Sequence, residues 1–306
     1  MLPYLRNASQ HQRSYETTTH RVKALRAQFT GVVMNDLSGP QIRAYTTGRH
    51  QAGASAATIN RELAALSAAI NWCNVEYEWA LPNPVKGRTM KEPEGRVRWL
   101  TRAEVESLCR AARKQRNGTL LVDFIHLAVN TGCRKEEMLG LEWRRVDLVN
   151  RLIYLEGRHT KAGKRRSIPL NEGAMDALKG RMAYRAKACP ESPWVFARAT
   201  GHRVTCIRRG FTSACESARI DDFVIHDLRH TCAAHLISAG VALAEVRDLL
   251  GHSTIMMTER YAHLAPARVR DAVRVLDGLR DQSSSRLVHA TIPAHQGGAL
   301  LRLLTP

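Results

Sequence analysis

The stretch that decides the fold runs from His226 to Tyr261 and carries three short motifs. They read His226-Asp227-Leu228-Arg229-His230-Thr231, Leu250-Gly251-His252-Ser253 and Met257-Thr258-Glu259-Arg260-Tyr261-Ala262-His263. The pattern around them is helical and is broken at Gly240 and Gly251. A compact helical segment can bring its histidines, arginine and tyrosine to one point. A cationic guanidinium, imidazoles that hold or move protons, and a phenol suit chemistry on a phosphate oxygen.

The chain before residue 85 reads as a helical domain. One helix opens at Ser38-Gly39-Pro40, with proline in its first turn. A longer helix opens at Thr58 and places five apolar residues on one face: Ile59, Leu63, Leu66, Ile70 and Cys73. Prolines and glycines among charged residues follow at 85–97 and predict a linker, since such a segment cannot continue a helix. The first predicted domain is therefore 1–84.

Residues 98–280 predict a second, mixed domain. Thr101-Arg102-Ala103-Glu104 is a capping-box pattern, and an apolar helix runs from about Leu120 to the break at Thr131-Gly132. Arg151–Leu155 and Ser167–Leu170 look like two strands around a basic turn. The predicted fold class is mainly α with a small β-sheet (an α+β catalytic domain) behind an N-terminal helical domain. A tail, 281–306, ends in apolar residues and is predicted to dock, on a neighbouring protomer or on its own chain.

The charge balance predicts a polyanionic partner. The chain has 306 residues, with 46 Lys and Arg against 28 Asp and Glu, a net charge of +18. No long apolar run or basic amphipathic anchor is visible, so nucleic acid is favoured over a membrane, and a basic but ordinary cytosolic protein is the alternative. Seven scattered cysteines without a CxxC pair indicate reduced thiols rather than disulfides or zinc. No signal peptide is evident, so we expect a cytoplasmic, nucleoid-associated protein.

The three motifs resemble the HxLRH, LGH and nucleophile-tyrosine motifs of the tyrosine recombinase (phage integrase) family. An upstream segment, Thr131 to Glu137, reads TGCRKEE and resembles the family's TGxRxxE box. The layout is also similar, because a helical core-binding domain ahead of a mixed catalytic domain is typical of the family. In its members these two domains clamp a DNA duplex.

The resemblance implies a catalytic set, and no metal or nucleotide cofactor. By this resemblance Arg134 and Arg229 would bind the non-bridging oxygens of one phosphodiester, with Glu137 as a supporting residue that orients Arg134. Lys161 would protonate the departing 5′ oxygen, and His252 would donate to a phosphate oxygen. His226 would assist proton removal from Tyr261, which would attack the phosphorus. No P-loop, GxGxxG motif or acidic cluster is present, in keeping with chemistry that conserves the phosphodiester energy in a 3′-phosphotyrosyl bond.

Taken singly, each residue has a plainer interpretation. Arg134 and Glu137 could form a surface ion pair, and Lys161 could be part of a basic turn on the DNA backbone, with Lys164 as the competing general acid. Lone histidines are commonly core residues, and a tyrosine commonly buries its ring while its hydroxyl contacts solvent. Further candidate DNA contacts, Asn60, Arg61 and Lys164, could equally be solvated. His230 and His263 fall outside the matched positions and are expected to be structural.

The resulting prediction is a site-specific DNA recombinase of the integrase type. It would act as a homotetramer on two double-stranded DNA sites, without a membrane partner. Whether it also requires a DNA-bending protein or a directionality factor is left open by the sequence. The alternatives are a chromosome-dimer-resolving tyrosine recombinase, a catalytically silent DNA-binding regulator, and a type IB topoisomerase.

Overall fold

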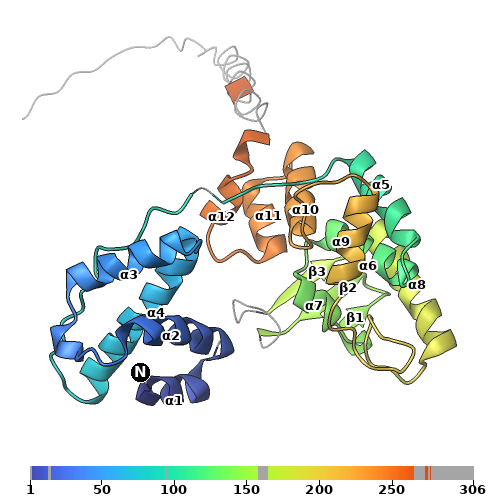
Figure 1. Ribbon diagram of the computed structural model, residues 1–306. Coiled ribbons are helices and arrows are strands. Elements are labelled where there is room, and N and C mark those ends of the chain that lie inside the picture. The colour runs from blue at the N-terminus through green and yellow to red at the C-terminus, as the bar shows by residue number, and fades with distance from the viewer. Residues whose placement is uncertain are drawn as a thin grey trace, which may run out of the picture. The chain divides into compact units, whose positions relative to one another are not determined.

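A computed structural model describes residues 2–12, 15–93, 95–157, 165–264, 273, 274 and 276. The chain divides into two compact units, Met1–Arg96 and Val97–Pro306 (Figure 1). It is mostly helical with one three-stranded sheet, which confirms the predicted fold class. No helix in the described part of the chain combines the length and apolarity of a membrane span.

The first unit is a helical bundle. Its α-helices are α1 (Leu2–His11), α2 (Tyr15–Phe29), α3 (Gly39–Gln51) and α4 (Ala56–Glu76), with a short 3-10 turn, η1 (Met34–Asp36). Helix α3 begins where predicted, and Ser38 forms a capping box with Gln41. Helix α4 begins earlier than the predicted Thr58, because the side chain of Ser55 accepts from the Thr58 backbone N–H. The predicted apolar face of α4 is buried up to Ile70, and Cys73 is half-buried.

Part of the segment predicted as a linker packs with the first unit. Val85 is buried in the core of that unit, and Met90 packs against it. The Asn60 side chain accepts from the Met90 backbone N–H (2.8 Å) and donates to the Met90 carbonyl (2.9 Å). Proline and glycine content indicated a break in the helices correctly, but it could not show that the following residues are held by an amide on α4.

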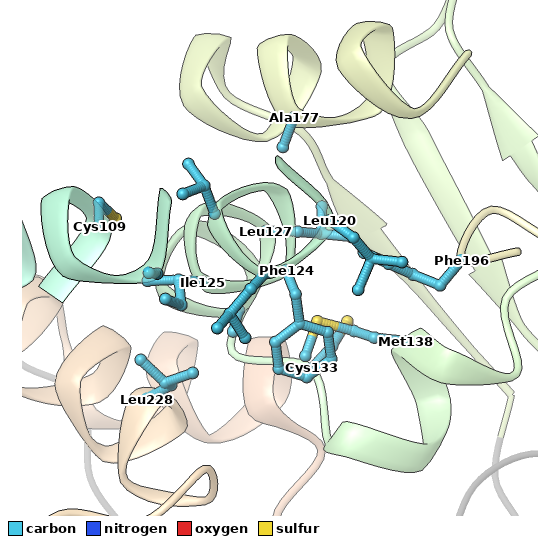
Figure 2. Close-up of a cluster of buried hydrophobic side chains, with 14 of the residues drawn as sticks. Cys109, Leu120, Phe124, Ile125, Leu127, Cys133, Met138, Ala177, Phe196 and Leu228 are labelled. Carbon is cyan, nitrogen blue, oxygen red and sulfur yellow. The ribbon is translucent and has the colours of Figure 1, made fainter. Parts of the chain in front are cut away.

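The second unit is built around α6. Its larger helices are α5 (Arg102–Arg113), α6 (Gly118–Thr131), α8 (Glu172–Ala188), α9 (Arg208–Ser217), α10 (Asp227–Ser238) and α11 (Leu243–Leu250), with short turns α7 (Lys135–Leu139), α12 (Met256–Glu259), η2 (Trp143–Arg145) and η4 (Ala262–Leu264). Figure 2 shows Phe124 and Leu127 of α6 among apolar side chains from the surrounding elements, including Leu228 of α10. The predicted Thr101–Glu104 capping box is present at the start of α5.

A small antiparallel sheet has the order β1-β2-β3. Its strands are β1 (Val146–Asp147), β2 (Leu152–Leu155) and β3 (Arg166–Pro169). Strands β2 and β3 confirm the two predicted strands, with Ile153 opposite Ile168 in register. Strand β1 was not predicted, because two residues are too short to show an alternation of polar and apolar side chains. The segment of the chain between β2 and β3 holds Lys161 and Lys164, which lie outside the described residues.

The chain beyond Leu264 is described only at three positions. The sequence after Tyr261 places apolar residues at helical spacing, namely Val269, Ala272, Val273, Leu276 and Leu279. Of these, Val273 and Leu276 are described and exposed, and the others lie outside the described residues. The tail 281–306 lies outside them as well.

Candidate active site

Arg134 is presented by a turn between two helices. Helix α6 ends at Gly132, whose φ of 62° is left-handed. A side chain at Gly132 would collide with Leu250, so glycine is required there. Arg134 then caps α7, and its Nη1 donates to Glu137 Oε1 (3.0 Å) while its Nη2 donates to the Gly251 carbonyl (3.3 Å). The first arginine is therefore fixed to the helix that follows it and to the end of α11.

Glu137 holds two arginines at once. Its carboxylate is buried, and its Oε2 accepts from the Arg134 backbone N–H (2.9 Å) and from Arg166 Nη2 (2.7 Å). Arg166 also donates to the carbonyl of Leu250 (2.5 Å). The Arg134–Glu137 pair therefore exists, but it is not the surface ion pair that was the plainer interpretation. Arg166, at the start of β3, was missed because nothing in its local sequence distinguishes it from its basic neighbours.

Arg229 is buried in the first turn of α10. Its Nη1 donates to the Gly132 carbonyl (2.7 Å), and its Nη2 is buried without a hydrogen-bond partner among the described residues. Burial and the charges of Arg134 and Arg166 lower the pKa of Arg229 to about 9. At neutral pH it is still a cation, so the site holds more positive than negative charge and one unused buried donor.

His252 follows directly on the left-handed Gly251 that ends α11. Its Nδ1 pairs with the Thr258 hydroxyl (2.9 Å), and Thr258 is fully buried. Burial, with the cations Arg229 and Arg134, lowers the pKa of His252 to about 3. The ring is therefore neutral at neutral pH, and if Nδ1 accepts from Thr258, then Nε2 carries a proton that it can donate.

Tyr261 is almost completely buried, at 1% exposure. It packs in a small apolar cluster with residues of α10 and α11, including Ile237 and Val246. Its hydroxyl is hydrogen-bonded to Nδ1 of His230. Burial raises the pKa of Tyr261 to about 12, although the nearby Arg260 and Arg229 act in the opposite direction. The phenol is therefore protonated in this state.

The histidine in contact with the Tyr261 hydroxyl is His230, which sequence analysis had taken as structural. His226, the matched position, lies at the exposed start of α10 and packs edge to face on His230, with ring centroids 5.1 Å apart. The structure therefore places His230, and not the matched His226, against the Tyr261 hydroxyl. Its spacing of four residues from His226, which places both on one helix face, was the signal available in the sequence. His263 is exposed in η4.

The structure thus brings Arg134, Glu137, Arg229, His252 and Tyr261 into one network of the second unit, through Gly132, Gly251 and the shared arginine contacts. Lys161 lies outside the described residues, as does its competitor Lys164. In the described part of the chain, no cluster of three or more His, Cys, Asp or Glu suited to a metal ion is found.

The two DNA-contact candidates of the first unit differ in their surroundings. The Asn60 side chain is occupied by Met90 and Glu92, to which its amide nitrogen donates at 2.9 Å in each case. Arg61 is exposed on α4. Asn60 thus has a structural task that the sequence did not reveal, and a DNA contact of either residue stays a prediction.

Comparison with known proteins gives matches along both units. The family model described as "Phage integrase family" matches residues 98–268, and that described as "Phage integrase, N-terminal domain" matches residues 3–91. The integrase of Salmonella phage P22 is 27% identical over 70% of this chain and 56% of its own length. The chain spans about half the length of this integrase and of a shufflon-specific DNA recombinase of Escherichia coli, which is 32% identical over 74% of this chain.

Two solved structures share the fold. The Tn1549 transposon integrase in complex with a circular intermediate DNA superposes with a TM-score of 0.70 at 19% identity, covering 88% of this chain and 98% of that one. A lambda integrase tetramer bound to a Holliday junction gives a TM-score of 0.69 at 20% identity, covering 85% of this chain and 75% of that one.

Proposed function

Because the chain belongs to the phage integrase family, we propose that it is a site-specific DNA recombinase that cuts and rejoins DNA through Tyr261. The phenol oxygen of Tyr261 attacks a phosphodiester, forms a 3′-phosphotyrosyl bond and releases a 5′ hydroxyl. The observation that carries the proposal is the surplus of positive charge beside this tyrosine. Arg134 and Arg166 share one buried carboxylate, and Arg229, a third cation nearby, keeps a buried donor unused.

In this proposal the two matched arginines bind the non-bridging oxygens of the phosphate. A guanidinium offers two parallel donors, which suit the equatorial oxygens of a phosphorane better than an ammonium does. Glu137 orients Arg134 by accepting from both its backbone and its side chain. The unpaired Nη2 of Arg229 supports this role, because a buried unused donor is costly unless a ligand oxygen occupies it.

His252 donates a hydrogen bond to a phosphate oxygen, and Lys161 protonates the departing 5′ oxygen. The neutral His252 ring suits donation, since its Nδ1 is occupied by Thr258. The assignment of Lys161, with Lys164 as the competitor, rests on the sequence resemblance alone. His226 assists removal of the Tyr261 proton.

At the level of the assembly, we infer that four protomers hold two duplex sites and exchange strands in pairs. As an integrase, the chain integrates or excises a mobile element, and it would work at the nucleoid. A chromosome-dimer-resolving recombinase uses the same chemistry and remains the alternative. A catalytically silent DNA-binding regulator is disfavoured, because Arg134, Arg229, His252 and Tyr261 all keep the side chains that the chemistry needs and lie in one network.

The test is covalent capture on a suicide DNA substrate, from which the cut end diffuses away. Wild-type protein is expected to form a DNA adduct without ATP and in the presence of EDTA, and Tyr261→Phe is expected to form none. Tyr154→Phe is the matched control, because Tyr154 is an exposed tyrosine on β2 of the same unit. An adduct from Tyr261→Phe protein would refute the nucleophile, and abolition by EDTA would refute metal-free chemistry.

A further inference from the structure

Helix α10 presents two histidines on one face, one turn apart. His226 lies at its exposed start, and His230 lies one turn further in and is half-buried. Their rings meet edge to face, with 5.1 Å between centroids and 89° between planes. Beyond them is Tyr261, whose ring centroid is 5.9 Å from that of His230 and whose hydroxyl is hydrogen-bonded to His230 Nδ1. Exposure therefore falls from His226 through His230 to the tyrosine.

Tyr261 cannot attack a phosphate while its hydroxyl keeps the proton. Burial raises its pKa to about 12, and the opposing charges of Arg260 and Arg229 do not reverse that shift. At neutral pH the phenolate fraction is then only about 10⁻⁵. A nucleophile of this kind needs a base within hydrogen-bond reach of the proton. The imidazole that contacts the Tyr261 hydroxyl in the described part of the chain belongs to His230.

We propose that His230 is the general base that takes the hydroxyl proton of Tyr261, and is therefore a catalytic residue outside the set that the family motifs assign. The inference rests on the proposed function. The groups around it fit a base: His226 and Tyr261 contact its ring, and His252 is coupled to it electrostatically. The cations Arg260 and Arg229 act on Tyr261 in the direction of its phenolate, against the larger opposing effect of burial, so removal of the proton still needs a base.

The step balances within one cycle. Nδ1 of a neutral His230 ring, protonated on Nε2, accepts the proton as the O–H bond of Tyr261 breaks. The phenolate oxygen forms a bond to phosphorus, the bond from phosphorus to the 5′ oxygen breaks, and that oxygen takes a proton from the general acid, proposed as Lys161. His230 stays protonated while the covalent bond exists. On religation it returns the proton to the departing Tyr261 oxygen.

His226 then acts through His230 rather than on the tyrosine directly. Its ring edge contacts the His230 ring and fixes its orientation. This makes His226 a positioning residue, and it accounts for assistance in proton removal by a group at the exposed start of the helix.

The experiment is single-turnover cleavage of the suicide substrate by the full chain. His230→Asn, which keeps a polar atom near the place of Nδ1 but cannot take the proton, and His230→Ala are expected to lower the rate by about 10²- to 10⁴-fold. DNA binding should be unchanged. His235→Ala is the matched control: His235 is a half-buried histidine of the same helix, and its Nε2 pairs with the Leu100 carbonyl (2.8 Å). It should alter the melting temperature and leave the rate within about threefold.

A more acidic phenol at position 261 distinguishes a role of His230 as general base from a purely structural role. With a ring-fluorinated tyrosine at position 261, the phenol loses its proton more readily, so the penalty of His230→Asn should shrink by about tenfold or more. A substrate with sulfur at the 5′ position, which removes the need for a general acid, should leave that penalty unchanged. If His230→Ala does not fold, His230→Asn decides.

Three results overturn the inference. The first is a His230→Asn rate equal to wild type, and the second is a penalty that fluorination does not reduce. The third is that fluorination of Tyr261 reduces the rate penalty of His226→Asn but leaves the rate penalty of His230→Asn unchanged. That result would make His226 the base. In each of these cases wild-type protein still forms the Tyr261 adduct, so the proposed function survives. Absence of the wild-type adduct refutes the proposed function and this inference together.

Discussion

Each unit of the chain buries a glutamate against arginine, and the two glutamates are used differently. In the first unit, Glu62 accepts from Arg49 at both oxygens (2.6 and 3.0 Å) and from the Tyr45 hydroxyl (2.7 Å). In the second unit, the carboxylate of Glu137 is divided between Arg134 and Arg166. One negative charge thus meets one positive charge in the first unit, but two in the second, with Arg229 as a third cation nearby.

The cluster around Glu62 stabilises the fold of its unit, whereas the cluster around Glu137 has an excess of positive charge that a ligand can neutralise. Burial alone would raise the pKa of Glu62, but hydrogen bonds from Arg49 and Tyr45 outweigh it, and the pKa is lowered. That cluster is neutral and complete. In the second unit the pKa of Arg229 falls to about 9 through burial and the two neighbouring arginines. Those cations repel one another, and a phosphate would offset the repulsion.

The largest expected effect is that of removing the shared carboxylate. Glu137→Ala leaves Arg134 and Arg166, both largely buried, without their counter-charge, and should cost about 3–5 kcal/mol in the second unit. Glu62→Ala should cost less, about 1–2 kcal/mol, since Arg49 is one-third exposed and can turn to water. Hydrogen–deuterium exchange of the full chain, resolved by peptide, measures each unit separately. Equal losses would break the comparison.

Next in size is the effect of exchanging arginine for lysine. Arg134→Lys and Arg229→Lys should each lower cleavage by about 10²-fold or more and leave DNA binding nearly intact, because the lost second donor acts mainly in the transition state. Arg49→Lys, the control in the first unit, should leave the cleavage rate of bound protein unchanged. The measurement is single-turnover cleavage beside equilibrium binding. A parallel loss of both would make these residues ordinary phosphate anchors.

Local signals in the sequence were enough for most of the fold. The start of α3 after Ser38, the Thr101 capping box and the apolar face of α4 from Ile59 to Ile70 have short-range patterns, and each was found where predicted. Strand β1 was not predictable because two residues are too short to show an alternation, and the packing of Met90 on Asn60 was not predictable because the two residues are distant in the chain.

For the site, the sequence motifs predicted which residues share one network, but they did not predict the contacts between those residues. Arg166 pairs with Glu137 across 29 positions, and His230 with Tyr261 across 31. Pairings at such separations are set by the fold and leave no periodic trace in the sequence. The family motifs pointed to His226 as the partner of the tyrosine, whereas the contact with its hydroxyl is made by the histidine one turn later.

A smaller effect is expected from acid. The folded pKa of His252 is lowered to about 3 by burial and by Arg229 and Arg134, below its unfolded value of about 6.5. The unfolded state then binds more protons between these values, so stability from this group is present above pH 6.5 and is lost as pH falls toward 3. The slope is at most about 1.4 kcal/mol per pH unit. Urea unfolding across this range should show it, and His252→Gln should flatten it; an unchanged slope would refute the assignment.

The smallest effect should come from the glutamate directly before Glu137. Glu136 pairs with Arg203 at 2.9 Å, but its side chain is 62% exposed and that of Arg203 is 34% exposed. Solvent screens such a pair and both side chains lose rotamer entropy by forming it, so Glu136→Ala should cost no more than about 1 kcal/mol. It should also leave cleavage unchanged, since Glu136 pairs with Lys135 and Arg203 and not with the arginines of the site. Two adjacent carboxylates on one short helix then differ in effect by severalfold, because only one of them is buried between the arginines of the site. A loss of cleavage in Glu136→Ala comparable to that in Glu137→Ala would show that total charge near α7, rather than the buried contacts, controls the site.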